Sequence, residues 1–212
     1  MTGIIYVVKK RDKDMARRTA AEKADTHVRI IKQASRVFRA RGSGVGIADV
    51  MDEVGLTHGG FYRHFESKDD LLVEAVSLSL HEIAERLVRA AEGAEPGRER
   101  EAIITAYLSP EHLAHPETWC AVAALAGDLG RAPAAVRKRI DAAMVAYMER
   151  LAPYMPGASD EQRRAMGIVL LSGMSGAIAM IRAFGDKHMR ESALAMVRDY
   201  YLRTFAGTVL DR

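Results

Sequence analysis

The chain has 212 residues, of which 49% are apolar and 28% charged, a balance typical of a folded globular protein. Its single cysteine, Cys120, excludes an internal disulfide framework and a zinc site built from several cysteines. Apolar runs such as residues 4–8 and 168–171 are shorter than the roughly 20 residues that span a bilayer, and no signal-peptide pattern follows the first of them. The sequence therefore predicts a cytoplasmic protein with no membrane partner.

Charge is unevenly distributed along the chain. Residues 1–65 hold 13 Lys and Arg against 7 Asp and Glu, whereas residues 66–212 hold 18 against 21. A basic segment attached to a slightly acidic body is expected when one part of a protein meets phosphate and the other does not. A basic face is also common on proteins that bind no nucleic acid, so charge alone leaves the function open.

The N-terminal third of the chain is expected to be helical after a charged, disordered extension over residues 1–24. Apolar residues then recur at helical spacing until Gly42 stops the pattern. Gly55 ends a second helix in the left-handed conformation that favours glycine, and Thr57 and Ser67 are suitable N-caps for the next two. The predicted helices cover residues 26–41, 47–54, 58–64 and 68–91.

The rest of the chain is also predicted to be helical, with prolines between the helices. No run of alternating apolar and polar residues predicts a strand, and the sequence contains no internal repeat. The expected fold is all-α, with a small N-terminal three-helix unit and a larger C-terminal helical bundle. The predicted helices of the bundle cover residues 98–108, 117–129, 134–152, 160–183 and 188–207.

Two short helices joined by Gly55-Leu56-Thr57 have the length and turn chemistry of a helix-turn-helix. The sequence of residues 47–72 also resembles the DNA-binding signature of the TetR (TetR/AcrR) family. Beyond about residues 26–75 the likeness lies only in the number of helices and the total length. Gly46 departs from the Ser or Thr that commonly caps the second helix, and Met51 from a usual Ala. The positions that carry the resemblance are Gly42, Val50, Gly55, Gly59, Tyr62, His64, Phe65, Ser67, Lys68, Leu71 and Leu72.

The resemblance implies a DNA-binding helix-turn-helix domain over residues 25–68 and a helical ligand-sensing and dimerisation domain over residues 69–212. It implies a homodimeric transcriptional regulator that binds double-stranded operator DNA, by family habit as a repressor. A small-molecule inducer of unknown identity, or modification of Cys120, is expected to release the operator. No cofactor, resident metal or catalytic residue is expected.

The outer surface of the third helix is the predicted DNA-contacting surface. Phe61 and Phe65 are four residues apart and are expected in the small core instead. Two adjacent glycines are poor helix formers, which fits a helix that approaches the DNA backbone closely. The resemblance places Tyr62 and Lys68 on phosphates. The residues expected to contact DNA are Thr57, His58, Gly59, Gly60, Tyr62, Arg63, His64 and Lys68.

Cys120 admits two interpretations. It lies near the start of a predicted helix, where free N–H groups stabilise a thiolate, and an accessible thiolate is the usual form of an electrophile or oxidant sensor. The segment from Tyr107 to Ala126 is also similar to a subgroup of the family with a cysteine here, some of whose members respond to electrophiles. A lone cysteine is more often an inert, buried apolar residue, and Trp119 could bury it.

Aromatic and Met residues of the bundle are candidates for an inducer pocket. The same residue types at helical spacing are equally typical of a plain hydrophobic core. The candidate pocket residues are Tyr107, Trp119, Met144, Tyr147, Met148 and Met174.

In the resembled family the last two long helices form a four-helix dimer interface with their copies. Small residues in the helix over residues 160–183 would let two helix backbones approach closely, although they could equally serve packing within one chain. A dimer is expected because two recognition helices must reach half-sites about one helical turn apart. The candidate interface residues are Ser172, Gly173, Gly176 and Ala179.

Two other classes of protein are less consistent with the sequence. An enzyme could use Cys120 as nucleophile with His112 or His115 as base, but the sequence has neither a sheet to carry a nucleophile elbow nor a glycine-rich phosphate loop. The same two histidines could hold a metal, although no third ligand is evident and a solvated turn is expected there. A protein that organises DNA without specificity would carry basic charge along its whole length.

Overall fold

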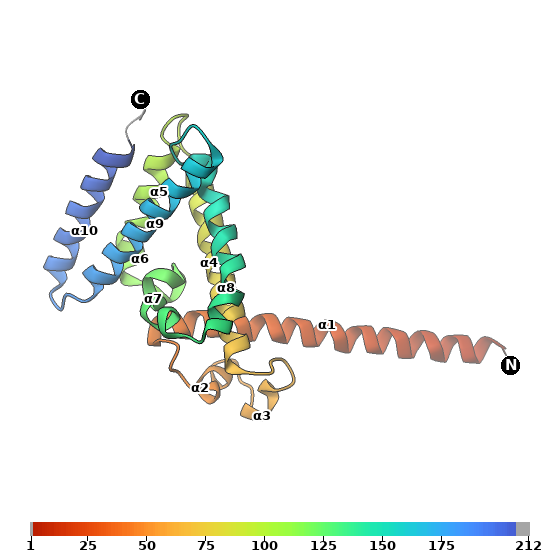
Figure 1. The fold of residues 1–212 in the computed structure, drawn as a ribbon. Helices are drawn as coiled ribbons and strands as arrows, with labels where there is room; N and C mark the ends of the chain where they lie inside the picture. The colour runs from red at the N-terminus through yellow and green to blue at the C-terminus, as the bar shows by residue number, and fades with distance from the viewer. Residues whose placement is uncertain (1, 207–212) are drawn as a thin grey trace.

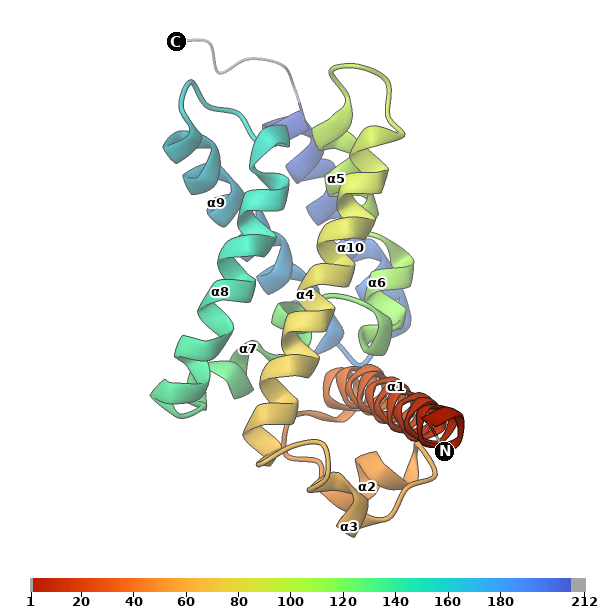
Figure 2. The same cartoon turned by 90° about the vertical axis from the view of Figure 1, so that its right-hand side faces the viewer.

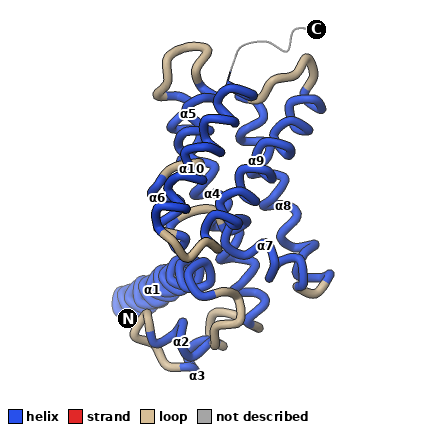
Figure 3. Tube along the Cα trace, turned by 90° about the vertical axis from the view of Figure 1, so that its left-hand side faces the viewer, coloured by secondary structure: helices blue, strands red, loops and turns tan. Residues whose placement is uncertain are grey.

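A computed structural model describes residues 2–206 of the chain, with side chains from residue 20 onward. Every regular element in that range is a helix, and the connections are loops and turns (Figure 3). The all-α fold predicted from the sequence is therefore confirmed.

The N-terminal unit consists of three helices and the start of a fourth. Figure 1 shows α1 projecting from the molecule as a long rod, with α2 and α3 below it and the first turns of α4 beside them. The apolar stripe of α1, which includes Ile30, Ala34 and Phe38, is completely or almost completely buried. These elements are α1 (Thr2–Arg41), α2 (Ile47–Asp52), α3 (His58–Phe61) and α4 (Lys68–Glu92).

In the body the long helix α4 runs upward from the N-terminal unit alongside α8 (Figure 2). The helix α10 lies next to α9 at the edge of the molecule. The body contains α5 (Glu99–Tyr107), α6 (Pro110–Ala114), the 3₁₀ turn η1 (Pro116–Thr118), α7 (Ala121–Arg131), α8 (Ala134–Leu151), the 3₁₀ turn η2 (Ala152–Tyr154), α9 (Asp160–Arg182), α10 (Lys187–Tyr201) and the π-helical turn η3 (Leu202–Ala206).

The N-terminal extension differs from its prediction. Residues 1–24 were expected to be disordered, whereas α1 already begins at Thr2, residue 1 lying outside the described range. The segment 15–25 contains no Gly or Pro and is rich in Ala, Arg, Glu and Lys, which are strong helix formers. Local propensity therefore extends the helix beyond the part that is packed.

The segment before α7 also differs from its prediction. The single helix expected over residues 117–129 is divided, because η1 ends at Thr118 and Cys120 is the N-cap of α7. The short α6, which was not predicted, begins where the Ser109 hydroxyl accepts a hydrogen bond from the main-chain N–H of His112 at 3.1 Å. Pro110 at the first position of α6 fixes a backbone angle suited to a helix start. Several short elements thus replace one longer predicted helix.

The helix α9 is long and apolar enough to cross a membrane by length and composition. This corrects the expectation that every apolar stretch is too short to span a bilayer. Within the most apolar 18-residue window 39% of the residues are buried inside the structure. A core helix of a soluble protein passes the same test, so α9 is weak evidence for membrane insertion.

Candidate nucleic-acid interface

The helices α2 and α3 are held together by apolar side chains and a tight turn. Val50, Met51 and Phe61 are completely buried. Gly55 adopts a φ of +71°, a left-handed conformation that side chains rarely tolerate. The next residue, Leu56, donates its main-chain N–H to the Met51 carbonyl at 2.9 Å, which closes the turn. The predicted helix-turn-helix is thus formed, but α2 ends at Asp52 and α3 at Phe61, short of the predicted ends at residues 54 and 64.

The structure accounts for both departures from the family pattern. Gly46 has no side chain with which to cap α2, but the Asp49 carboxylate accepts a hydrogen bond from the Gly46 N–H at 3.2 Å. This is the second half of a capping box and satisfies one free donor at the helix start. Met51 is completely buried, so the larger side chain is accommodated inside the core.

The outward face of α3 presents several of the predicted DNA-contacting residues. Thr57, His58, Gly59, Tyr62 and Arg63 are all exposed. The Tyr62 side chain is 60% exposed, and its ring meets the His58 ring edge-on with centroids 5.7 Å apart. A Cβ added at Gly59 would meet no atom within 4 Å, so nothing inside this chain requires a glycine there.

Lys68 is the first residue of α4 and follows α3 by seven residues in the chain. The Ser67 hydroxyl caps the helix by accepting a hydrogen bond from the Asp70 N–H at 3.1 Å. The free N–H groups of a helix start favour an anion, and the Lys68 ammonium adds a positive charge beside them. Lys68 is half-buried, which leaves its charged end within reach of solvent. Both features suit a phosphate.

His64 does not lie on the outer surface as predicted. It is half-buried against α1, with its ring centroid 6.0 Å from that of His27, and its Nδ1 is buried without a hydrogen-bond partner. Burial lowers the pKa of His64, and the nearby His27, Lys23 and Arg63 lower it further. The side chain therefore packs between α1 and α3 as a neutral imidazole.

His27, which joins α1 to α4, was not predicted from the sequence. Its ring stacks on Phe65 with centroids 4.5 Å apart, and its Nε2 lies 2.9 Å from the Glu74 carboxylate. Its position three residues before Ile30, on the same stripe of α1, was the available signal. Phe65 is buried as predicted.

Comparison with known proteins agrees with this geometry. The model of "Bacterial regulatory proteins, tetR family" matches residues 30–75. The HTH-type transcriptional regulator TtgR of Pseudomonas putida is 42% identical over 79 residues, which cover 37% of each chain. TtgW, an uncharacterized HTH-type transcriptional regulator of the same species, is 37% identical over 99 residues, which cover 46% of this chain and 72% of that protein.

The chain belongs to the TetR family. A TetR-family regulator from Agrobacterium tumefaciens has the same fold over 84% of this chain and 98% of its own, with a TM-score of 0.65 and 18% identity. The match to TtgR spans only 37% of that relative, and the family model covers residues 30–75, which contain the helix-turn-helix. The family is one of transcriptional regulators, which agrees with the prediction that the chain is no enzyme.

The body of this TetR-family chain gathers the predicted pocket residues into its core. Tyr107, Trp119, Tyr147 and Met174 are buried, whereas Met144 and Met148 on α8 are half-buried at its margin. All six belong to one hydrophobic cluster or pack against it. In this structure their side chains therefore form part of the hydrophobic core.

Cys120 is completely buried. Its thiol lies beside the hydroxyl groups of Tyr107 and Tyr147, and burial together with that neighbour raises the pKa of both tyrosines. Trp119 is also buried, as the alternative interpretation of Cys120 supposed. A sensor needs an accessible thiol, and in this structure the Cys120 thiol is not accessible.

The two histidines before η1 lie in different environments. His112 is buried, with its ring stacked on Trp119 at a centroid separation of 4.7 Å. His115 is exposed and its Nδ1 lies 3.3 Å from the Glu117 carboxylate. The expectation of a solvated turn is therefore wrong for His112. Within the described side chains no group of three or more His, Cys, Asp or Glu is placed to hold a metal.

The small residues of α9 divide into two groups. Ser172, Gly176 and Ala179 are exposed, whereas Gly173 is half-buried against α10. A Cβ added at Gly173 would lie 2.1 Å from the Tyr201 hydroxyl oxygen, so this glycine serves packing within the chain. The large apolar side chains that are exposed on the same two helices form their apolar surface, namely Ile168, Val169 and Met180 of α9 and Met189, Met196 and Tyr200 of α10.

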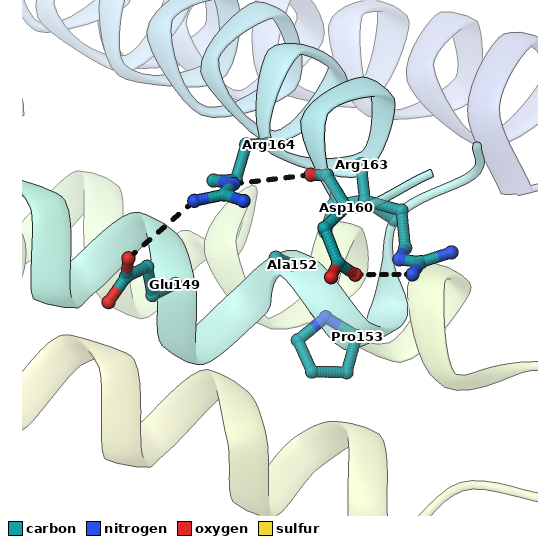
Figure 4. Close-up of a pocket in the computed structure, with 7 residues that line it drawn as sticks. Glu149, Ala152, Pro153, Asp160, Arg163 and Arg164 are labelled. Atoms are coloured by element: carbon teal, nitrogen blue, oxygen red, sulfur yellow. Dashed lines mark hydrogen bonds and ion pairs between the residues drawn. The ribbon is translucent and has the colours of Figure 1, made fainter. Parts of the chain in front are cut away.

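A surface depression of about 580 Å³ lies at the end of the body opposite the helix-turn-helix, where η2 meets the start of α9 (Figure 4). Its charged side chains already pair with one another. Arg163 contacts the Asp160 carboxylate at 2.5 Å and Arg164 contacts Glu149 at 3.8 Å. Because these charges are already paired and the depression is open to water, we do not assign a ligand to it.

Proposed function

We propose that the chain is a homodimeric transcriptional regulator that binds a specific operator through α3 and the start of α4, represses transcription there, and is released by a small molecule bound in the body. It acts in the cytoplasm. The observation that carries the proposal is the exposed face of α3, where Gly59 has open space around it and Tyr62 stands in solvent. A helix that must approach a DNA backbone needs such a flat, accessible face.

Phosphate contacts are assigned to Tyr62 and Lys68, which position the protein on the duplex. Thr57, His58 and Arg63 are assigned to base edges or neighbouring phosphates, because they share the exposed face of α3. His64 is not assigned a contact, since it packs against α1. Gly60 is half-buried, and its lack of a side chain would let the α3 backbone approach the DNA closely.

The dimer is assigned to the exposed apolar surface of α9 and α10. Six of the nine large apolar side chains that are exposed in the described part of the chain lie on these two helices. A second copy of the chain would cover this surface, and small residues such as Gly176 and Ala179 would allow the helices to approach closely. Contiguous exposed apolar surface of this kind marks an interaction site.

Release of the operator is assigned to a small molecule in preference to modification of Cys120, because the thiol is buried. Coupling to the DNA-binding face runs through Arg39 of α1. Its guanidinium donates hydrogen bonds to the Ser79 hydroxyl at 2.8 Å and to the Trp119 carbonyl, so one buried side chain ties α1, α4 and the segment before α7 together. Burial lowers the pKa of Arg39 to about 10, which keeps the charge at neutral pH.

Fluorescence anisotropy of the purified protein on duplex DNA from upstream of its own gene tests the proposal. We expect nanomolar, salt-dependent binding, with a scrambled duplex bound at least about a thousandfold more weakly. Equal binding of the two duplexes, together with the failure of a genome-wide selection to find any preferred site, would refute a specific regulator.

A further inference from the structure

Three polar atoms in the interior of the body have no hydrogen-bond partner. They are Nε2 of His112, the hydroxyl oxygen of Tyr147 and Nη1 of Arg182. His112 is completely buried and the Tyr147 side chain is 2% exposed, so water does not reach either group freely. Buried polar groups are nearly always paired in native proteins, and an unpaired one calls for a water, an ion or a ligand as its partner.

The three groups belong to one cluster. The His112 ring meets the Tyr107 ring edge-on, with centroids 4.5 Å apart, and Arg182 donates a hydrogen bond to the main-chain carbonyl of His112. The Cys120 thiol lies beside the hydroxyl groups of both Tyr107 and Tyr147, but a thiol is only a weak hydrogen-bonding group, and it leaves the Tyr147 hydroxyl without a partner of normal geometry. Four elements (α5, α6, α8 and α9) and the N-cap of α7 therefore converge on this point.

The hydrogen-bonding role of each free atom follows from its neighbours. Nδ1 of His112 lies 2.7 Å from the Tyr107 carbonyl oxygen, which can only accept, so Nδ1 carries the proton. Burial lowers the pKa of His112 to about 3, so the ring is neutral and Nε2 is a free acceptor. Nη1 of Arg182 is a free donor on a cation, because Nε and Nη2 are already used by the carbonyls of Leu113 and His112.

We infer that this cluster is the recognition site for the effector, and that the effector is a small aromatic acid carrying a hydroxyl group. The hydroxyl donates to Nε2 of His112, and the carboxylate accepts from Arg182 and Tyr147. The site favours a ligand with an aromatic ring because its own groups are flat. Trp119 stacks on His112, and the Arg86 guanidinium lies 4.2 Å from the centroid of the Trp119 ring. This inference rests on the proposed function and gives its effector a chemical class.

The same contacts connect ligand binding to DNA release. The Trp119 ring covers the His112 ring, so a ligand that reaches Nε2 of His112 must displace Trp119. The main-chain carbonyl of Trp119 accepts hydrogen bonds from Arg39 of α1 and, at 3.1 Å, from Ser79 of α4. Displacement of Trp119 therefore loosens the contact that sets α1 and α4 relative to each other.

A pair of tyrosine variants tests the unpaired hydroxyl without any ligand. Tyr147→Phe removes an unpaired group, so we expect its melting temperature to equal or exceed that of the wild type. Tyr107→Phe removes a hydroxyl that is bonded to Ser175 at 2.7 Å, so we expect its melting temperature to fall by about 2–4 °C. Equal losses in the two variants would show that the Tyr147 hydroxyl has a structural partner, and would overturn the inference.

Titration calorimetry of the full chain with 2-, 3- and 4-hydroxybenzoate tests the ligand class. We expect at least one isomer to bind in the micromolar range, with benzoate and the matching hydroxybenzyl alcohol at least about tenfold weaker. Tyr147→Phe is expected to weaken the binding isomer about tenfold. Arg182→Gln is expected to remove the difference between the acid and the alcohol.

The inference is overturned if no isomer binds at millimolar concentration, or if benzoate binds as tightly as the hydroxybenzoates. Fluorescence anisotropy of operator DNA with the same protein samples distinguishes failure of the ligand class from failure of the proposed function. Specific DNA binding without a hydroxybenzoate response would refute only the ligand class, whereas loss of specific DNA binding in the wild type would refute the regulator.

Discussion

The carboxylate of Asp128 on α7 accepts a hydrogen bond of 2.8 Å from the main-chain N–H of Ser43, in the loop that joins α1 to α2. The helix α7 thus contacts the α1–α2 loop near one end, and its N-cap at the other end, Cys120, lies in the buried polar cluster. This bond is the main reason that the pKa of Asp128 lies below its ordinary value of 3.8. Since the pKa is depressed by folding, the stabilisation is present above pH 3.8 and is lost as the pH falls through the folded value.

Replacement of Asp128 tests whether α7 holds the α1–α2 loop. Asp128→Ala is expected to lower the free energy of unfolding by about 1 kcal/mol, because one charge-assisted hydrogen bond is lost and water partly replaces it. Arg131→Ala is the control, since it removes the other partner of Asp128 through a side chain that is 76% exposed. Urea unfolding at pH 7 measures both. An equal effect of the two changes would contradict a specific role for the bond to Ser43.

Lys68→Ala is expected to weaken binding to specific and scrambled duplexes by a similar factor. The loss of one phosphate contact should also reduce the slope of log affinity against log salt by about one. Lys187→Ala on α10, where the side chain is 82% exposed and far along the chain from the helix-turn-helix, should leave the slope unchanged. A change in base preference on replacing Lys68 would show that it reads sequence instead.

The burial of Cys120 predicts slow chemistry at its thiol. N-ethylmaleimide should label the native protein slower than the urea-unfolded protein by on the order of a hundredfold or more, because the thiol must wait for local opening. Mass spectrometry of quenched samples gives both rates. Labelling of the native protein at the unfolded rate, with loss of operator binding that Cys120→Ser prevents, would restore modification of this residue as the releasing signal.

Because His112 is buried as a neutral ring, we expect the folded protein to lose stability in mild acid. Its folded pKa of about 3 lies below the ordinary 6.5, through burial first and then the charges of Arg182 and Arg86, while the bond to the Tyr107 carbonyl opposes them. Only the unfolded chain takes up the proton between these values, so stability is full above pH 6.5 and falls as the pH drops toward 3. The slope for one such group approaches about 1.4 kcal/mol per pH unit.

Urea unfolding of wild type and His112→Phe between pH 7.5 and 5 measures this effect. The phenyl ring keeps a flat face for Trp119 but does not titrate, so the variant should lose less stability over that range. Parallel curves for the two proteins would mean that other groups cause the acid sensitivity.

The exposed apolar surface of α9 and α10 predicts the site of dimerisation. Met196→Glu places a charge on a side chain that is 64% exposed at this surface, and we expect the dimer to dissociate in sedimentation velocity. Val145→Glu on α8 is the matched control, since Val145 is 53% exposed but lies outside the surface. If only Val145→Glu dissociated the dimer, the interface would lie on α8 and not on α9 and α10.

The sequence predicted most of the N-terminal unit because local chemistry decides it. The left-handed turn after α2 requires a glycine, which Gly55 supplies, and Ser67 caps α4. Single residues therefore fix these helix ends. His64 was misplaced because its direction depends on how α1 packs, and its predicted helix ends at Phe61 instead of continuing. A helical wheel drawn past the true end of a helix assigns a side chain to the wrong face.

The buried polar cluster around His112 was less predictable, because it depends on contacts between distant elements. The sequence indicated Tyr107, Trp119 and Tyr147 as pocket candidates, which the structure buries in one core. His112 and Arg182 were not among them, since they are 70 residues apart and meet only when α6 packs on α9. Burial of a polar side chain without a partner is visible only in the folded structure.

In vitro selection from a pool of random duplexes tests the central claim, that this chain is a dimeric, sequence-specific DNA-binding protein, most directly. We expect enrichment of one motif with two related half-sites whose centres are about one helical turn apart, and loss of that enrichment in Lys68→Ala. Binding that retains duplexes in proportion to their abundance, with no motif after repeated rounds, would contradict the account.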